Sequence, residues 1–168
     1  MARRDDVPAV IAPPPVLFLL ALALGFALDR ALPTAVLAGV PAAARLALAG
    51  LALAVAGGLG VAGILAFRRA GTAVEPWHPT NALVTTGIYA RLRNPMYLGL
   101  VLISAAVALA AAGDGVLLAT AGLAVALHYG VVKREERYLR ARFGASYRRY
   151  LAAVPRWGLP VASGRNDH

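Results

Sequence analysis

Two neighbouring glutamates near the C-terminus are the residues best placed to do chemistry. Glu135 and Glu136 lie near the start of a polar, arginine-rich segment that runs from Lys133 to Tyr150. Glu136 precedes Arg140 by four residues, which is the favourable spacing for an ion pair on a helix surface. The sequence alone therefore predicts a surface ion pair for Glu136.

Glu135 belongs to a different face of the same predicted helix. At helical spacing it aligns with an apolar stripe that consists of Leu139, Phe143 and Tyr147. Tyr150 and Leu151 extend this stripe past Gly144. A carboxylate on this inward face needs a partner. We expect that partner to be a ligand amine, a bound cation, Arg91 or Arg93. The whole segment is typical of a helix that lies on a membrane or folds back over a loop.

A second polar segment, Arg68 to Asn94, separates two apolar runs. Its Thr85-Thr86-Gly87 predicts a turn, and Asn94-Pro95 predicts a helix start with Asn94 at the N-cap and Pro95 at the first helical position. Unpaired amides at such a helix start can bind a carboxylate or phosphate. A loop, a turn and a cap without any ligand explain these residues equally well.

Four apolar segments must position these polar residues. The chain is 60% hydrophobic with a mean hydropathy of +0.66, which is too apolar for a soluble domain of 168 residues. The segments run from Val7 or Pro13 to Leu28, from Ala42 to Phe67, from Tyr97 to Ala112 and from Val116 to Val132.

The first two segments are long enough to cross a bilayer, whereas the last two, joined by Gly113-Asp114-Gly115, either cross fully or form a short hairpin. We therefore predict an all-α polytopic membrane protein with about four transmembrane helices and a cytoplasmic C-terminal helical segment. Residues 1–67 would form an N-terminal transmembrane hairpin, and residues 68–168 the functional core.

The basic residues predict the orientation in the membrane. Of the 17 Lys and Arg, only Arg30 and Arg45 lie on one side of the predicted spans. The positive-inside rule then places both termini and the central loop in the cytoplasm, as in a multi-pass protein of a bacterial inner membrane. The net charge of +9 clusters at the ends of apolar runs and accompanies no nucleic-acid-reading motif, so we expect a membrane partner and no nucleic acid.

Other residue types narrow the chemistry further. The chain has no cysteine, and its three histidines lack carboxylate companions, so we expect no metal site. The second apolar segment carries small residues four apart, which predict a face that packs on another helix. They are Gly50, Ala54, Gly58, Ala62 and Ala66.

Three motifs in order resemble those of one enzyme family. They are Leu-Val-Thr-x-Gly-x-Tyr at 83–89, Arg-Asn-Pro-Met-Tyr-Leu-Gly at 93–99, and Glu-Glu-x-x-Leu-x-x-x-Phe-Gly-x-x-Tyr-x-x-Tyr at 135–150. This pattern resembles the isoprenylcysteine carboxyl methyltransferases and their phospholipid methyltransferase relatives. The resemblance covers roughly residues 68–160, including the Val154-Pro155-Arg156 ending.

The resemblance implies S-adenosylmethionine as cofactor. Its contacts would fall on Asn81, Ala82, Leu83, Val84, Tyr89, Asn94, Pro95, Met96, Tyr97 and Glu135. Two positions depart from the family: Asn94 replaces a common histidine, and Val131 lies where some members have a substrate-binding arginine. Val131 argues against the prenylated cysteine carboxylate that is the eukaryotic substrate.

Methyl transfer from a sulfonium needs alignment and exclusion of water rather than a triad or a metal. Glu135 would bind the cofactor's amino group, while Leu83, Val84 and Tyr89 would wall the adenosine. A lipid or other apolar acceptor, with a carboxylate or an amine, would enter from the bilayer. Glu136 and Tyr147 are the catalytic residues we expect, with His128 as an alternative, to assist loss of a proton from an amine.

Two other functions fit the same residues. Membrane reductases of the sterol-reductase type share a related tyrosine and Arg-x-Pro-x-Tyr pattern and use NADPH. A non-catalytic membrane scaffold is the third interpretation, and it predicts that Glu135 and Tyr97 are dispensable. The sequence leaves the acceptor and the oligomeric state open.

Overall fold

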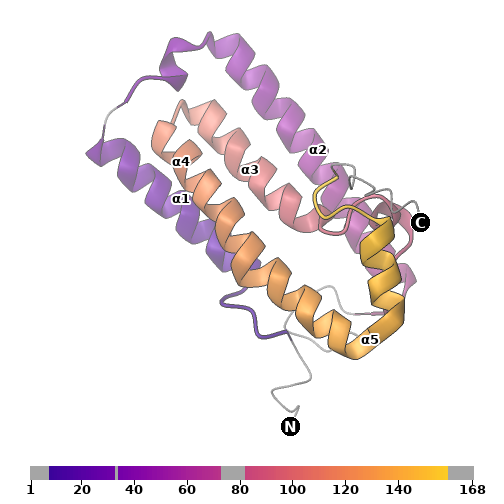
Figure 1. Ribbon diagram of the computed structural model, residues 1–168. Helices are drawn as coiled ribbons and strands as arrows, with labels where there is room; N and C mark the ends of the chain where they lie inside the picture. The colour runs from indigo at the N-terminus through magenta and orange to yellow at the C-terminus, as the bar shows by residue number, and fades with distance from the viewer. Residues whose placement is uncertain (1–7, 33, 73–81, 159–168) are drawn as a thin grey trace, which may run out of the picture.

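The computed structural model describes residues 8–32, 34–72 and 82–158, and this part of the chain is helical with no strand (Figure 1). Four of its helices run back and forth along the bundle: α1 (Pro14–Ala31), α2 (Ala42–Arg69), α3 (Pro95–Ala111) and α4 (Asp114–Leu127). A π-helical turn, η4 (His128–Val132), joins α4 to α5 (Lys133–Ala153). Two short 3₁₀ helices, η2 (Leu37–Gly39) and η3 (Gly87–Ala90), lie in the connections.

The four helices lie side by side in the order α2, α3, α4, α1 (Figure 1). The α3–α4 pair is in the middle, with α2 packed on α3 and α1 packed on α4. By length and composition α1, α2 and the continuous helix that begins with α4 can cross a membrane, and α3 is a shorter apolar helix of 17 residues. The predicted fold class, an all-α polytopic membrane protein, is confirmed.

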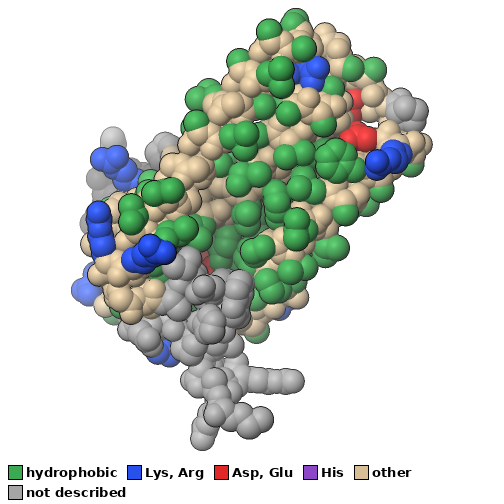
Figure 2. Space-filling model, turned by 180° about the vertical axis from the view of Figure 1, so that it is seen from behind, with side chains coloured by type: hydrophobic (Ala, Val, Ile, Leu, Met, Phe, Trp, Pro, Cys, Tyr) green, Lys and Arg blue, Asp and Glu red, His purple; other side chains and the backbone are tan. Residues whose placement is uncertain are grey.

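The outer surface of the bundle is apolar, as a lipid-facing surface must be. Leu19 and Leu20 on α1, Leu51 on α2 and Leu118 on α4 are all at least 60% exposed. Figure 2 shows hydrophobic side chains over the length of the helices, with Lys and Arg gathered mainly at one end. This end, which carries α5 and the C-terminus of α2, is called the basic end.

Close approach between helices depends on small residues, but not on the stripe that the sequence suggested. The α2 residues buried in the bundle are Ala49, Ala56, Gly63 and Ala66. Gly50 and Gly58 have no atom within 4 Å of where a Cβ would lie, so the predicted packing face was wrong except near Ala66. The helix is apolar on every side, and a four-residue repeat of small residues therefore does not identify the buried side.

Two acidic side chains form hydrogen bonds with backbone amides at the end of the bundle opposite the basic end. Asp114 accepts hydrogen bonds from the amides of Val36 (2.8 Å) and Leu37 (2.9 Å), and Asp29 accepts one from the Gly115 amide (2.6 Å). The α3–α4 turn is shorter than expected, because Asp114 and Gly115 already belong to α4. These bonds tie the connection after α1 to the start of α4.

At the basic end the chain folds back on itself. Gly144 interrupts α5 with φ +51° and ψ −120°, a conformation that favours glycine, and α5 bends sharply (Figure 1). After the bend the Tyr150 hydroxyl donates to the backbone carbonyl of Tyr89 at 2.7 Å. Of the two placements expected for this segment, folding back over the loop is the one found.

Candidate functional site

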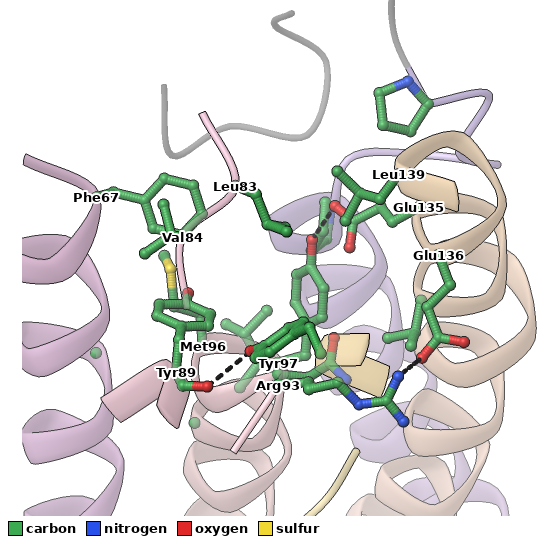
Figure 3. Close-up of a pocket in the computed structure, with 18 of the residues that line it drawn as sticks. Phe67, Leu83, Val84, Tyr89, Arg93, Met96, Tyr97, Glu135, Glu136 and Leu139 are labelled. Carbon is green, nitrogen blue, oxygen red and sulfur yellow. Dashed lines mark hydrogen bonds and ion pairs between the residues drawn. The ribbon is translucent and has the colours of Figure 1, made fainter. Parts of the chain in front are cut away.

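A cavity of about 460 Å³ lies at the basic end, which is within the range of roughly 300–1,000 Å³ usual for small-molecule sites (Figure 3). Five parts of the chain wall it: residues 8–15 at the start of α1, the second half of α2, residues 82–94, the first half of α3, and the helix from Val132 at the end of η4 into α5. The site therefore exists only because the bundle and the folded-back α5 meet here.

Glu135 and Tyr97 form a pair in the cavity wall. The Tyr97 hydroxyl donates a hydrogen bond to the Glu135 carboxylate at 2.7 Å, and the two side chains meet at one side of the cavity (Figure 3). Among the described residues Glu135 forms no ion pair. Burial raises its pKa from 4.5 to about 7, although the hydrogen bond from Tyr97 lowers it. The carboxylate is thus placed to gain from a cationic ligand.

The partner of Glu135 differs from the arginines that the sequence offered. Arg91 is exposed, and Arg93 donates to Glu136 at 2.9 Å instead. Tyr97 fills the role because its hydroxyl, on the first turn of α3, reaches the Glu135 carboxylate on the first turn of α5. Glu135 nevertheless lines the cavity, as its position on the inward face of the helix predicted.

Glu136 is buried, with only 7% of its side chain exposed, rather than part of a surface pair. Arg156 binds it through two hydrogen bonds, of 2.8 Å to Oε1 and 2.7 Å to Oε2, and Arg93 adds one to Oε1. The predicted contact with Arg140 exists at 3.8 Å, but Arg140 is 55% exposed and adds little. Glu136 in turn raises the pKa of Arg156 through these hydrogen bonds.

Aromatic side chains form much of the remaining wall at this end of the cavity. Phe67 meets the Tyr89 ring edge-on at 5.3 Å, and the Tyr147 and Tyr150 rings lie 6.0 Å apart. Burial raises the pKa values of Tyr89, Tyr147 and Tyr150, so these phenols stay neutral at physiological pH. Neutral aromatic rings beside a carboxylate favour a cationic ligand.

The cavity continues as an apolar channel along α3. Its lining here comes from Gly99, Leu100 and Ile103 of α3, with Ala56 and Gly60 of α2 opposite. Ile103 lies about 12 Å along α3 from Pro95, at a rise of about 1.5 Å per residue. The polar end of the cavity is therefore continuous with a passage at the depth of the membrane-spanning helices.

Most of the residues expected at a cofactor site line this one cavity. They are Ala82, Leu83, Val84, Tyr89, Asn94, Met96, Tyr97 and Glu135, joined by the two expected catalytic residues Glu136 and Tyr147. Pro95 is buried at the first position of α3 and does not line the cavity. Asn81, like His78, lies outside the described residues.

Asn94 and His128 have structural partners. Asn94 is at the N-cap of α3, as predicted, but its side chain makes no capping hydrogen bond; its Nδ2 donates to the Arg156 carbonyl at 3.1 Å. His128 accepts a 3.4 Å hydrogen bond from the Trp157 indole and does not line the cavity. The residues after α5 therefore form hydrogen bonds with the side chains of Asn94 and His128, and the sequence did not predict these partners.

Sequence reasoning missed several lining residues. Phe67 was read only as the end of a span, Tyr150 only as an extension of a stripe, and Arg93 only as a possible partner for Glu135. The position of Phe67 at the basic end of α2 was a usable signal, since the loop that follows was expected at the site. No sequence pattern predicts the contact between Arg156 and Glu136, because 20 residues separate them and no helical spacing relates them.

The similarity to known proteins agrees with this geometry. A sequence model of the phospholipid methyltransferase family matches residues 44–146, which is more than half of the 168-residue chain. The match begins near the start of α2 and ends within α5, so it spans most of the cavity wall. No curated protein and no solved structure matches the sequence. The chain belongs to the phospholipid methyltransferase family.

Proposed function

We propose that this membrane methyltransferase uses S-adenosylmethionine and transfers its methyl group to a lipophilic or membrane-associated acceptor. The observation that carries the proposal is Glu135, a carboxylate held by Tyr97 at 2.7 Å in an aromatic-walled cavity, with no ion-pair partner among the described residues. The ammonium of a methionine moiety is a cation of the right size for it. When bound, S-adenosylmethionine supplies an activated methyl group on a sulfonium.

The lining residues fit this cofactor in kind and in volume. Glu135 would hold the amino group, and Leu83, Val84 and Tyr89 would pack on the adenosine. The first amides of α3, at Met96 and Tyr97, would face the carboxylate, since Pro95 has no N–H. These residues would orient their ligands and exclude water, and methyl transfer from a sulfonium requires both.

The acceptor would reach the site through the apolar channel beside Gly99 and Ile103. Arg93 is the one basic residue in the described lining, and Glu136 binds it. With Glu135 bound to the cofactor's amino group, an acceptor carboxylate would meet neutral phenols and no free cation, whereas the aromatic rings would favour an amine. This contrast supports a lipid amine over a lipid carboxylate as the acceptor.

The wider setting is part of the same proposal. The basic end would face the cytoplasm of a bacterium, where its arginines meet anionic headgroups and the cofactor is soluble. Residues 68–168 would form the methyltransferase core. Residues 1–67 supply α1 and all but the last two residues of α2; these helices flank α3 and α4, and α2 contributes Gly60 and Phe67 to the cavity.

Transfer of label from methyl-labelled S-adenosylmethionine tests this function. The protein would be reconstituted in bilayers that contain either phosphatidylethanolamine or a long-chain carboxylic acid, and the lipids extracted. We expect label in the amine lipid, strong loss with Glu135→Gln, and normal transfer with Asp114→Asn at the opposite end of the bundle. Label in the acid alone would overturn the amine assignment. No transfer to either, with NADPH consumed instead, would overturn the methyltransferase proposal.

A further inference from the structure

The chain that follows α5 lies against the loop before α3. This strap, residues 154–158, begins with Val154, which is only 5% exposed. The Pro155 carbonyl accepts a hydrogen bond from the Arg93 amide at 3.1 Å, and the Arg156 carbonyl accepts one from Asn94 at 3.1 Å. The strap lies outside residues 44–146, the part of the chain that the family comparison covers.

Arg156 links the strap to both sides of the cavity. Its two hydrogen bonds to Glu136 reach the first turn of α5, and Glu136 passes the link to Arg93 through a bond of 2.9 Å. Arg93 and Glu136 both line the cavity, and their side chains are 10% and 7% exposed. Removing Arg156 would take away two of the three short hydrogen bonds to this buried carboxylate and leave only the bond from Arg93, which weakens the contact locally.

We propose that Arg156 is a positioning residue of this methyltransferase: through Glu136 and Arg93 it fixes the loop–α3 junction against α5. Tyr97 and Glu135 lie directly beside this junction, on α3 and on α5 respectively, so their 2.7 Å contact depends on it. The inference rests on the proposed function for its catalytic consequence. Its structural part, that the strap holds the loop–α3 junction against α5, stands on the contacts alone.

Glu136 takes a different role as a result. Arginines contact both of its carboxylate oxygens: Arg156 donates to both, and Arg93 donates to Oε1. With both oxygens engaged by arginines, the Glu136 side chain is held in place and is not directed at a ligand in the cavity. We therefore assign Glu136 to positioning, in place of the proton-transfer role suggested by the sequence.

The test compares Arg156→Met, Arg156→Lys and Arg140→Met. Arg140 also approaches Glu136, at 3.8 Å, but from the exposed side, so Arg140→Met is a matched control for loss of one positive charge. Three readouts are needed: affinity for S-adenosylhomocysteine by isothermal titration, amide hydrogen exchange in residues 89–97, and turnover at saturating cofactor. The second is independent of any cofactor.

We expect Arg156→Met to speed exchange in residues 89–97 and to weaken S-adenosylhomocysteine binding by about tenfold or more, which corresponds to the loss of a charge-assisted contact. Arg156→Lys should recover part of the affinity, because it keeps the charge but not the bidentate geometry. Turnover at saturating cofactor should fall less than the affinity. Arg140→Met should stay within about twofold of the wild type in all three readouts.

Three results would overturn the proposal. Unchanged exchange in Arg156→Met would show that the strap does not hold the wall. Faster exchange with unchanged affinity would reduce Arg156 to a stabilising residue with no effect on the site. Equal loss in Arg140→Met would mean that general charge, not this contact, is responsible. If the wild type fails to bind S-adenosylhomocysteine, the proposed function fails, while the exchange data still decide whether the strap holds the loop–α3 junction.

Discussion

Replacing Tyr97 by phenylalanine isolates the hydrogen bond that holds Glu135. The ring and its packing stay, and only the hydroxyl that donates to the carboxylate at 2.7 Å is lost. Burial raises the pKa of Glu135 to about 7, and the bond from Tyr97 opposes that rise. The substitution must therefore move the pKa of Glu135 further upward.

The size of the shift follows from the strength of the bond. A hydrogen bond to a charged group contributes about 1.5–3 kcal/mol, and one pKa unit corresponds to about 1.4 kcal/mol. The pKa of Glu135 should thus rise by roughly one to two units. At pH 7 about half of the wild-type carboxylates are ionised, but only about a hundredth to a tenth in the variant. If the cofactor needs the ionised form, affinity at pH 7 falls by roughly 5- to 50-fold.

Isothermal titration with S-adenosylhomocysteine between pH 5.5 and 8.5 measures this directly. Wild-type affinity should fall below about pH 7, and the Tyr97→Phe profile should have the same shape displaced to higher pH, with the difference shrinking toward pH 8.5. Glu135→Gln should bind weakly with little pH dependence. Superimposable profiles for wild type and Tyr97→Phe, or wild-type pH dependence in Glu135→Gln, would refute the reasoning.

Three further predictions concern packing and stability. Gly63→Val should lower the stability by about 1–3 kcal/mol and weaken S-adenosylhomocysteine binding, because an added Cβ would lie 2.9 Å from Met96 Cγ, whereas Gly58→Val meets nothing within 4 Å and serves as control. Asp114→Ala should lower the midpoint of thermal unfolding in detergent but leave the binding affinity unchanged, since it removes two hydrogen bonds at the far end of the bundle. The free energy of unfolding of the ligand-free protein should rise by about 1 kcal/mol per pH unit as pH falls from 7 to 5, because the pKa of Glu135 is higher in the folded state (about 7) than in the unfolded state (about 4.5). Glu135→Gln should remove this rise.

The membrane-spanning helices were predictable because lipid imposes a simple rule. Each long apolar run became a helix with bounds within a few residues of those expected, as with Ala42–Arg69 for the predicted Ala42–Phe67. The buried side of α2 was not predictable. Gly58 and Gly63 look alike in sequence, but only Gly63 faces a neighbour, and in lipid no polar side marks the other face.

At the site, local patterns predicted more than distant contacts. The Asn94-Pro95 helix start and the inward face of Glu135 follow from spacing along one helix, and both occur in the structure. The partner of Glu136 did not follow, because a local pair with Arg140 satisfied the pattern. Arg156 becomes the main partner only after Gly144 turns the chain back, and a single glycine does not reveal the direction of a turn.

The central claim is that the cavity binds S-adenosylmethionine through Glu135. The most direct test is isothermal titration of the detergent-purified protein with S-adenosylhomocysteine and, separately, with NADPH, for the wild type and Glu135→Ala. We predict saturable binding of S-adenosylhomocysteine by the wild type, loss of that binding in Glu135→Ala, and no heat with NADPH. Binding of NADPH alone, or S-adenosylhomocysteine binding that survives in Glu135→Ala, would contradict the account.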